Sequence, residues 1–197
     1  MNRVDTFKAE IYTIDGFLTA SECQMLRECI NTHATRSVVY QGTVEVLVES
    51  DERTSSTAKL KREYHPLINE INARISATLG IPQAFGEVMQ GQRYEKDQEF
   101  ISHTDYFKRK WYQWRKKPQR TWTFMIYLNE DCRGGETEFS FLKLIFKPKE
   151  GMAVVWRNLG SGGRPNPSTI HAGRPVTEGV KYIITKWFQD TRFQDHE

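Results

Sequence analysis

The segment His171 to Phe188, HAGRPVTEGVKYIITKWF, decides the fold, because its second half alternates between two sets of side chains. Val180, Tyr182, Ile184 and Phe188 fall on one face of the expected strand, and Lys181, Ile183, Thr185 and Trp187 fall on the other. A period of two residues is typical of a β-strand and not of a helix. The segment therefore predicts a strand near the end of the chain.

The same period recurs in the chain after residue 83. It is clearest in Thr121 to Leu128, TWTFMIYL, and it returns in Leu142 to Lys147 and in Met152, Val154 and Trp156. Turn residues separate these runs at Gly134-Gly135, in Pro148 to Gly151 and in Gly160 to Pro167. Many short alternating runs divided by turns predict a β-sandwich or a jelly roll.

Two amphipathic helices are expected before residue 83. Thr19 and Glu22 can form a capping box at the start of the first helix. Pro66 suits the first turn of the second helix, which should end at Gly80. We therefore expect an α+β, mainly β fold with one domain over residues 1–197. Residues 1–82 would form a helix-rich support, and residues 83–190 would form the jelly-roll core.

The composition indicates a globular protein without an obvious partner. The 197 residues include 28 basic and 25 acidic side chains, which gives a net charge of +3. No apolar run is long enough for a signal-peptide core or a membrane span. Cys23, Cys29 and Cys132 form no CxxC pair, which favours reduced thiols over disulfides or a zinc site. These features predict a cytoplasmic protein with no membrane partner, and they specify no oligomeric state.

Seven basic residues are concentrated in Lys108 to Arg120, KRKWYQWRKKPQR. The interpretation that we favour is an exposed charged loop between two strands. Basic residues interleaved with Trp111, Tyr112 and Trp114 could instead follow phosphates and stack on bases, as in an oxidative nucleic-acid demethylase. The stretch could also attract an acidic protein surface.

His103 and Asp105 stand two residues apart, so on a strand their side chains share one face and can bind one cation. The HxD pattern alone is equally consistent with an ordinary hydrogen-bonded loop histidine. A second imidazole from a distant strand would complete a facial triad, which leaves three positions of Fe(II) open. His171 is the candidate for this role, because His196 lies one residue from the end of the sequence and the other two histidines fall on helical segments.

Lys181 shares its face of the last strand with apolar residues. A buried ammonium is costly unless it meets an anion. The distal carboxylate of 2-oxoglutarate is such an anion, and a lysine offers it a point charge with three donors. Lys186 lies on the opposite face, and we expect it at the surface with its ammonium in water.

Together these elements resemble the prolyl 4-hydroxylase branch of the Fe(II)/2-oxoglutarate oxygenases over most of the chain. The resemblance starts with His103-x-Asp105, followed by His171, Lys181 ten residues later and Trp187 six after that. Five further segments also resemble segments of the family: RYEKDQEFISHTDYF, TWTFMIYLNEDCRGGETEF, FKPKEGMAVVWRNL, FLTASECQML and the loop Glu52 to Ser56. This joint match is far more specific than the metal pattern alone.

The resemblance implies a double-stranded β-helix, which is a jelly-roll barrel, with Fe²⁺ held by His103, Asp105 and His171. It also implies O2 and 2-oxoglutarate as co-substrates, and ascorbate as a further cofactor. Lys181 joins the three ligands in the expected catalytic set. The positions carried over are Tyr94, Thr137, Lys181 and Trp187 for 2-oxoglutarate, and Arg53, Ser55, Glu87, Arg120 and Trp187 for a peptide.

The implied activity is 4-hydroxylation of a prolyl residue in a peptide or protein, with release of succinate and CO2. Alternatives with the same chemistry act on a free amino acid or on nucleic acid, although the demethylases usually anchor 2-oxoglutarate with arginine rather than with a lysine such as Lys181. A catalytically idle binding module is disfavoured, because all three ligands and Lys181 are present. Phe100 and Gln189 stand where the family often has tyrosine and histidine, so the sequence leaves the substrate open.

Overall fold

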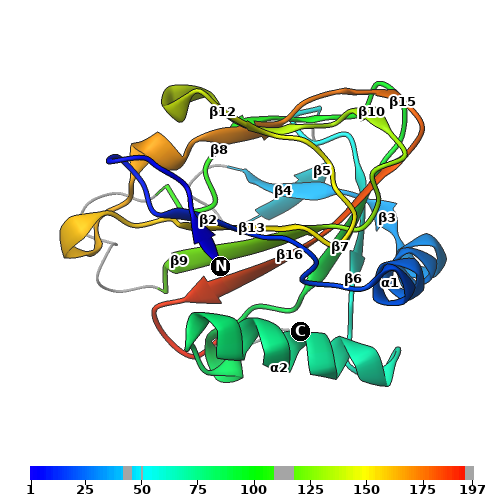
Figure 1. Cartoon of the computed structure of the whole chain (residues 1–197), viewed down its shortest axis with the longest axis horizontal. Helices are drawn as coiled ribbons and strands as arrows, with labels where there is room; N and C mark the ends of the chain where they lie inside the picture. The colour runs from blue at the N-terminus through cyan, green and yellow to red at the C-terminus, as the bar shows by residue number, and fades with distance from the viewer. Residues whose placement is uncertain (42–45, 50, 109–117, 194–197) are drawn as a thin grey trace.

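The computed structural model describes residues 1–41, 46–49, 51–108 and 118–193, and its largest element is an eight-stranded antiparallel sheet (Figure 1). In spatial order this sheet contains β1 (Asn2–Arg3), β2 (Ile11–Ile14), β13 (Ala153–Arg157), β9 (Arg120–Tyr127), β16 (Lys181–Gln189), β7 (Gln90–Tyr94), β6 (Ser56–Lys59) and β3 (Thr35–Arg36). Strands β1, β2, β3 and β6 come from the first 82 residues, so the predicted support region also contributes to the sheet.

A second, four-stranded antiparallel sheet contains β12 (Leu144–Phe146), β11 (Thr137–Phe139), β14 (His171–Gly173) and β8 (Phe100–His103). Two further strand pairs are β10 (Arg133–Gly134) with β15 (Val176–Glu178), and β4 (Val38–Gln41) with β5 (Val46–Glu49). Figure 1 shows the four-stranded sheet on one side of the large sheet and the helices α1 (Ala20–His33) and α2 (Pro66–Leu79) on the other. This arrangement confirms the predicted mainly β jelly roll braced by helices.

Both helices begin where their sequences predict, and α2 also ends there. The Thr19 hydroxyl accepts from the Glu22 amide, and the Glu22 carboxylate accepts from the Thr19 amide at 2.8 Å, which completes the capping box of α1. Pro66 starts α2, and Gly80 ends it in the left-handed conformation, with φ of 67°. The buried faces of the helices contain Cys23, Leu26, Ile30, Ile68, Ile71 and Ile75.

The alternating side chains of β9 and β16 separate two apolar cores. Phe124, Ile126, Leu128, Ile184 and Phe188 pack with the helices in one core, whereas Met125, Tyr127 and Ile183 belong to the other. In the described part of the chain, the short 3-10 segments are Gln83–Phe85, Ser140–Leu142, Ser161–Gly163 and Pro167–Thr169. The central strands are therefore covered on both faces, as the alternation of two partly apolar sets requires.

Two expectations from the sequence are wrong. Leu142 ends a 3-10 segment rather than starting a strand, and Lys143 then adopts a positive φ of 55°, so β12 begins only at Leu144. Lys186 is 4% exposed, because Ile184 and Phe188 on the same face of β16 pack into the core beneath the helices. Its ammonium donates to the carbonyl oxygen of Glu87 instead of reaching water.

Within the described ranges, neither α1 nor α2 is long and apolar enough to cross a membrane. Cys23, Cys29 and Cys132 are free thiols. Residues 109–117 of the basic stretch, which include Trp111, Tyr112 and Trp114, lie outside the described residues. The same is true of His196.

Candidate metal centre

His103 and His171 are direct cross-strand partners on the antiparallel strands β8 and β14. Asp105 follows β8 by two residues, and the ligand atoms of all three side chains lie within 4.8 Å of one another. The Nε2 atom of His103 lies 3.7 Å from Oδ1 of Asp105, and that of His171 lies 3.9 Å from Oδ2. The structure therefore brings the three predicted ligands together.

Both imidazole rings are oriented by main-chain carbonyl groups. The Nδ1 atom of His103 lies 2.8 Å from the Ile101 oxygen, and that of His171 lies 2.9 Å from the Thr169 oxygen. Because a carbonyl oxygen only accepts, each Nδ1 carries a proton, and Nε2 is the ring nitrogen left to bind a metal. Two imidazole nitrogens and one carboxylate form a donor set that suits Fe(II).

The protonation states of the cluster also suit a metal site. Burial, together with the neighbouring His171, lowers the pKa of His103 to about 3, so its imidazole is neutral. Burial on its own would raise the pKa of Asp105, but His171, His103, Arg120 and the hydrogen bond from Thr123 outweigh it and hold the pKa below its usual range. The centre therefore presents an ionised carboxylate beside a neutral imidazole.

The ladder between β14 and β8 contains a register shift next to the cluster. His171 pairs with His103, but Gly173 pairs with Phe100, so two steps along β14 match three along β8. This bulge places Phe100 and His103 on the same side of β8, and their rings stack with centroids 3.5 Å apart. The Phe100 ring thereby supports one face of a metal-ligand candidate.

A cavity next to the three ligands collects most of the other predicted site residues. Besides the ligands it is lined by Arg53, Gln92, Tyr94, Phe100, Met125, Thr137, Trp156, Gly173, Lys181, Ile183, Thr185 and Trp187. Gln92, Met125 and Trp156 had not been identified from the sequence. Their inward position follows from the strand alternation, but only after it is known which face of each strand meets the cavity.

Lys181 lies at the inner end of β16 and is 2% exposed. Burial lowers the pKa of its ammonium to about 8, and the acidic groups of Cys132 and Glu136 offset this only in part. Gly173 leaves the space beside it open, since a Cβ atom there would lie 3.6 Å from the Lys181 nitrogen. An anion in the cavity would offset the cost of this buried charge, which fits the predicted carboxylate contact.

Thr137 presents a hydroxyl group whose proton has a weak partner. Its oxygen accepts a hydrogen bond from the Tyr127 hydroxyl at 2.7 Å, while its own proton points to the Met125 sulfur at 3.6 Å. A thioether is a poor acceptor, so this proton is available to a carboxylate. Thr137 therefore fits its predicted role toward 2-oxoglutarate.

Three residues predicted for substrate form one buried unit at the edge of this cavity. Arg120 donates from Nε and from a terminal nitrogen to the two oxygens of Glu87, both at 2.7 Å, and its guanidinium carbon lies 4.0 Å from the Trp187 ring centre. Gln189 donates to the same carboxylate at 2.9 Å. Ser55 is instead fully buried, and its hydroxyl lies 2.8 Å from that of Ser37, so the structure does not bring it into the cavity lining.

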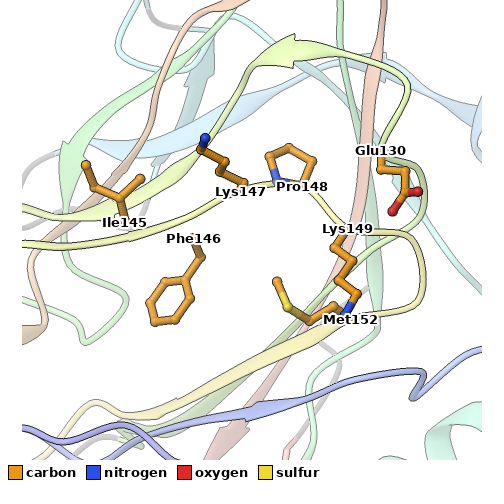
Figure 2. Close-up of a pocket in the computed structure, with 7 residues that line it drawn as sticks. All are labelled: Glu130, Ile145, Phe146, Lys147, Pro148, Lys149 and Met152. Atoms are coloured by element: carbon orange, nitrogen blue, oxygen red, sulfur yellow. The ribbon is translucent and has the colours of Figure 1, made fainter.

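A second hollow, with a volume of about 620 Å³, lies elsewhere on the protein, and Figure 2 shows the side chains around it. Its lining consists of Glu130, Ile145, Phe146, Lys147, Pro148, Lys149 and Met152. It contains none of the predicted ligands or co-substrate residues, and one of its lysines, Lys149, pairs with Asp15 at 2.7 Å. Chemistry rather than size therefore identifies the cavity beside His103 as the functional site.

Comparison with known proteins gives a consistent result. The sequence profile of the 2OG-Fe(II) oxygenase superfamily matches residues 89–189. Prolyl 4-hydroxylase 1 of Arabidopsis thaliana is 32% identical over 202 residues, which cover 94% of this chain and 71% of that protein.

Solved structures with the same fold include the viral collagen prolyl hydroxylase of Paramecium bursaria Chlorella virus-1 in its 2OG complex. It is 26% identical, with a TM-score of 0.74, over 92% of this chain and 96% of that one. A Trichoplax adhaerens prolyl hydroxylase, solved with a hypoxia inducible factor peptide fragment, has a TM-score of 0.68 over 91% of this chain and 83% of that one. At 15% identity, that second likeness shows the fold alone.

Proposed function

This chain belongs to the 2OG-Fe(II) oxygenase superfamily, and on that premise we propose that it hydroxylates a prolyl residue of a peptide or protein at C4. The observation that carries the proposal is one cavity lined by both His103, Asp105 and His171 and by the buried ammonium of Lys181. A metal-binding triad and an anchor for a dicarboxylate are the two parts that this chemistry needs in one place.

His103, Asp105 and His171 would hold Fe²⁺, and Lys181, Thr137 and Tyr94 would hold 2-oxoglutarate. When bound, iron, 2-oxoglutarate and O2 supply oxidative decarboxylation to succinate and CO2, with transfer of one oxygen atom into a C–H bond of the substrate. The protein orients the co-substrate through Lys181 and Thr137, and the buried aromatic walls exclude water from the site. Ascorbate would be the reductant that keeps the iron active.

Proline as the target is supported by the names of the relatives, which are prolyl hydroxylases in plants and in a virus. Arg53 lines the cavity, and the Glu87–Arg120 pair lies beside Trp187 at its edge. These groups would contact a peptide on either side of the reacting residue. A free amino acid would leave most of them unused.

We also propose a single catalytic domain over residues 1–197, with the helix-rich residues 1–82 as support and residues 83–190 as the jelly-roll core. A reducing compartment such as the cytoplasm is proposed as its location. The three free thiols support this second proposal, because secreted proteins tend to pair their cysteines.

The test is mass spectrometry of proline-rich and lysine-containing peptides after incubation with Fe(II), 2-oxoglutarate and ascorbate. We expect a gain of one oxygen atom on proline, with one succinate released for each hydroxylation. Oxygen on another residue would replace the proposed substrate. Succinate release that persists after His103→Ala would refute the proposed iron centre.

A further inference from the structure

A chain of three buried polar side chains leads away from the candidate metal centre. The Thr123 hydroxyl lies 2.6 Å from Oδ2 of Asp105, and the Asn158 amide nitrogen lies 2.9 Å from the Thr123 oxygen. Thr123 and Asn158 are both fully buried, and Asp105 is 6% exposed. Neither Thr123 nor Asn158 was among the site residues predicted from the sequence.

The direction of these hydrogen bonds follows from the groups themselves. The ionised Asp105 carboxylate can only accept, so the single Thr123 hydroxyl proton is donated to it. The Thr123 oxygen then has only lone pairs left, so Asn158 must present its NH2 group. We call this chain of hydrogen bonds the relay: Asn158 donates to Thr123, and Thr123 donates to Asp105. The relay stabilises the ionised form of the Asp105 carboxylate.

Thr123 is held in the middle of the eight-stranded sheet. It lies on β9 directly opposite Trp156 of β13 and Trp187 of β16. The three side chains form a row on the inner face, and both indole rings line the cavity. A donor at this position cannot shift without moving three paired strands, so it fixes Asp105 more firmly than a loop residue could.

The relay distinguishes the two oxygens of Asp105. Oδ2 accepts the Thr123 hydrogen bond and lies 3.9 Å from Nε2 of His171, whereas Oδ1 lies 3.7 Å from Nε2 of His103 and does not receive that bond. We propose that Thr123, supported by Asn158, is a positioning residue that fixes the orientation of the Asp105 carboxylate and leaves Oδ1, which does not receive the Thr123 hydrogen bond, available to bind a metal ion. This inference rests on the proposed iron centre. It assigns the two residues a role in metal affinity and coordination geometry, not in contact with substrate.

Asn158 also borders the segment that positions His171. Its carbonyl oxygen accepts from the Asn166 amide at 2.9 Å, and the Asn166 oxygen accepts from the Thr169 amide at 3.1 Å. The Thr169 oxygen in turn accepts from Nδ1 of His171 at 2.9 Å. One residue thus anchors two of the three ligands, Asp105 through its side chain and His171 through its main chain.

The experiment measures Co(II) binding to the metal-free protein, by calorimetry and by the visible absorption of bound Co(II), in matched variants. Thr123→Val keeps the shape and removes the hydroxyl, and Thr123→Ser keeps the hydroxyl. Thr121→Val is the control, because Thr121 lies two residues away on β9 and its hydroxyl bonds to the Phe188 carbonyl at 3.1 Å. Melting temperatures of the metal-free variants separate loss of stability from loss of coordination.

We expect Thr123→Val to raise the Co(II) dissociation constant by about 10- to 100-fold and to change the Co(II) spectrum. Thr123→Ser should stay within about threefold of the wild type. Wild-type affinity and an unchanged spectrum in Thr123→Val would overturn the inference, as would an equal loss in Thr121→Val. If Thr123→Val does not fold, Asn158→Ala decides: a several-fold weaker affinity supports the relay and a wild-type affinity overturns it. A wild-type protein that binds no Co(II) would refute the metal centre itself, and the relay with it.

Discussion

Lys181 is the direct cross-strand partner of Tyr94, and its ammonium lies 5.0 Å from the centre of the Tyr94 ring. The same nitrogen lies 5.7 Å from the Tyr127 ring. The ring faces carry partial negative charge, so they stabilise the ammonium without neutralising it. The buried ammonium of Lys181 therefore remains without a full counter-charge from these rings, and a carboxylate of a bound dicarboxylate can supply it.

Affinity for 2-oxoglutarate should therefore depend on the proton of Lys181. Burial lowers its pKa to about 8, so the dissociation constant for 2-oxoglutarate should rise as the pH increases beyond about 8. Lys181→Met should weaken binding by roughly 10- to 100-fold at neutral pH, which corresponds to the loss of one charged hydrogen bond. Binding is measured on the Mn(II)-loaded protein by calorimetry between pH 6.5 and pH 9.5, a range set by roughly one and a half units on either side of that pKa.

Lys181→Arg supplies the control, because arginine keeps its charge over this whole range. Its affinity for 2-oxoglutarate should be nearly independent of pH, whatever its value at neutral pH. A wild-type pH profile in Lys181→Arg would assign the dependence to another group.

Lys186 should make stability depend on pH in the alkaline range. Burial, with the nearby Arg62, lowers its pKa from 10.5 to about 8, so between these values the unfolded chain binds one proton that the folded chain does not. The free energy of unfolding contributed by this group then rises with pH, by about 1.4 kcal/mol per pH unit. Between pH 8 and pH 10.5, the free energy of unfolding of Lys186→Met should therefore rise less steeply with pH than that of the wild type, by about 1.4 kcal/mol per pH unit. Urea unfolding at several pH values measures both slopes. Parallel curves for the two proteins would contradict the buried charge.

The Glu87–Arg120 pair should be strongly coupled. Both side chains are about nine-tenths buried, so Glu87→Ala should lower the free energy of unfolding by about 3–5 kcal/mol, because it removes the bidentate carboxylate from a buried guanidinium. The double variant Glu87→Ala/Arg120→Ala should lose less than the sum of the two single variants, by about 0.5–3 kcal/mol. Denaturant unfolding of all four proteins measures this difference. Additive losses would mean that the pair contributes little as a unit.

Gly91 should not tolerate a side chain. A Cβ atom on this residue of β7 would collide with Ile30 of α1, lying 2.6 Å from its Cδ1 atom. Gly91→Ala should therefore lower the free energy of unfolding by about 1–3 kcal/mol. Gly160→Ala is the control, since its φ is −82° and the nearest atom would be 3.8 Å away, and its effect should stay within about 0.5 kcal/mol. Equal losses in both variants would show that the helix can shift to make room.

The sequence was most informative where one local rule determines the outcome. The capping box at Thr19, the stop at Gly80 and the two-faced alternation of β16 all appear as predicted, because each depends on neighbouring residues alone. The proximity of His103, Asp105 and His171 was also predicted, first because the positions of the other histidines did not suit a third ligand and then because the three residues match a family pattern. The pattern of these residues did not specify which strands would be adjacent.

What the sequence could not specify depends on packing between distant segments. Lys186 was expected in water, and only the helices that cover its face explain its burial. The Lys143 turn shortened a predicted strand, because a positive φ is not visible in an alternating pattern. Thr123 and Asn158 were missed for a similar reason, since a threonine in a strand acquires meaning only when the carboxylate opposite it is known.

The register shift beside His171 makes the centre sensitive to the number of residues as well as to their identity. The four residues 100–103 of β8 fit against the three residues 171–173 of β14. Phe100 and His103 stand three residues apart, so on a regular strand their side chains would face opposite sides, and only the extra residue brings both rings inward. A regular ladder at the same spacing would leave one of the two stacked rings outside the cavity. The stacked pair beside the metal ligands therefore depends on the bulge as much as on the two aromatic residues themselves.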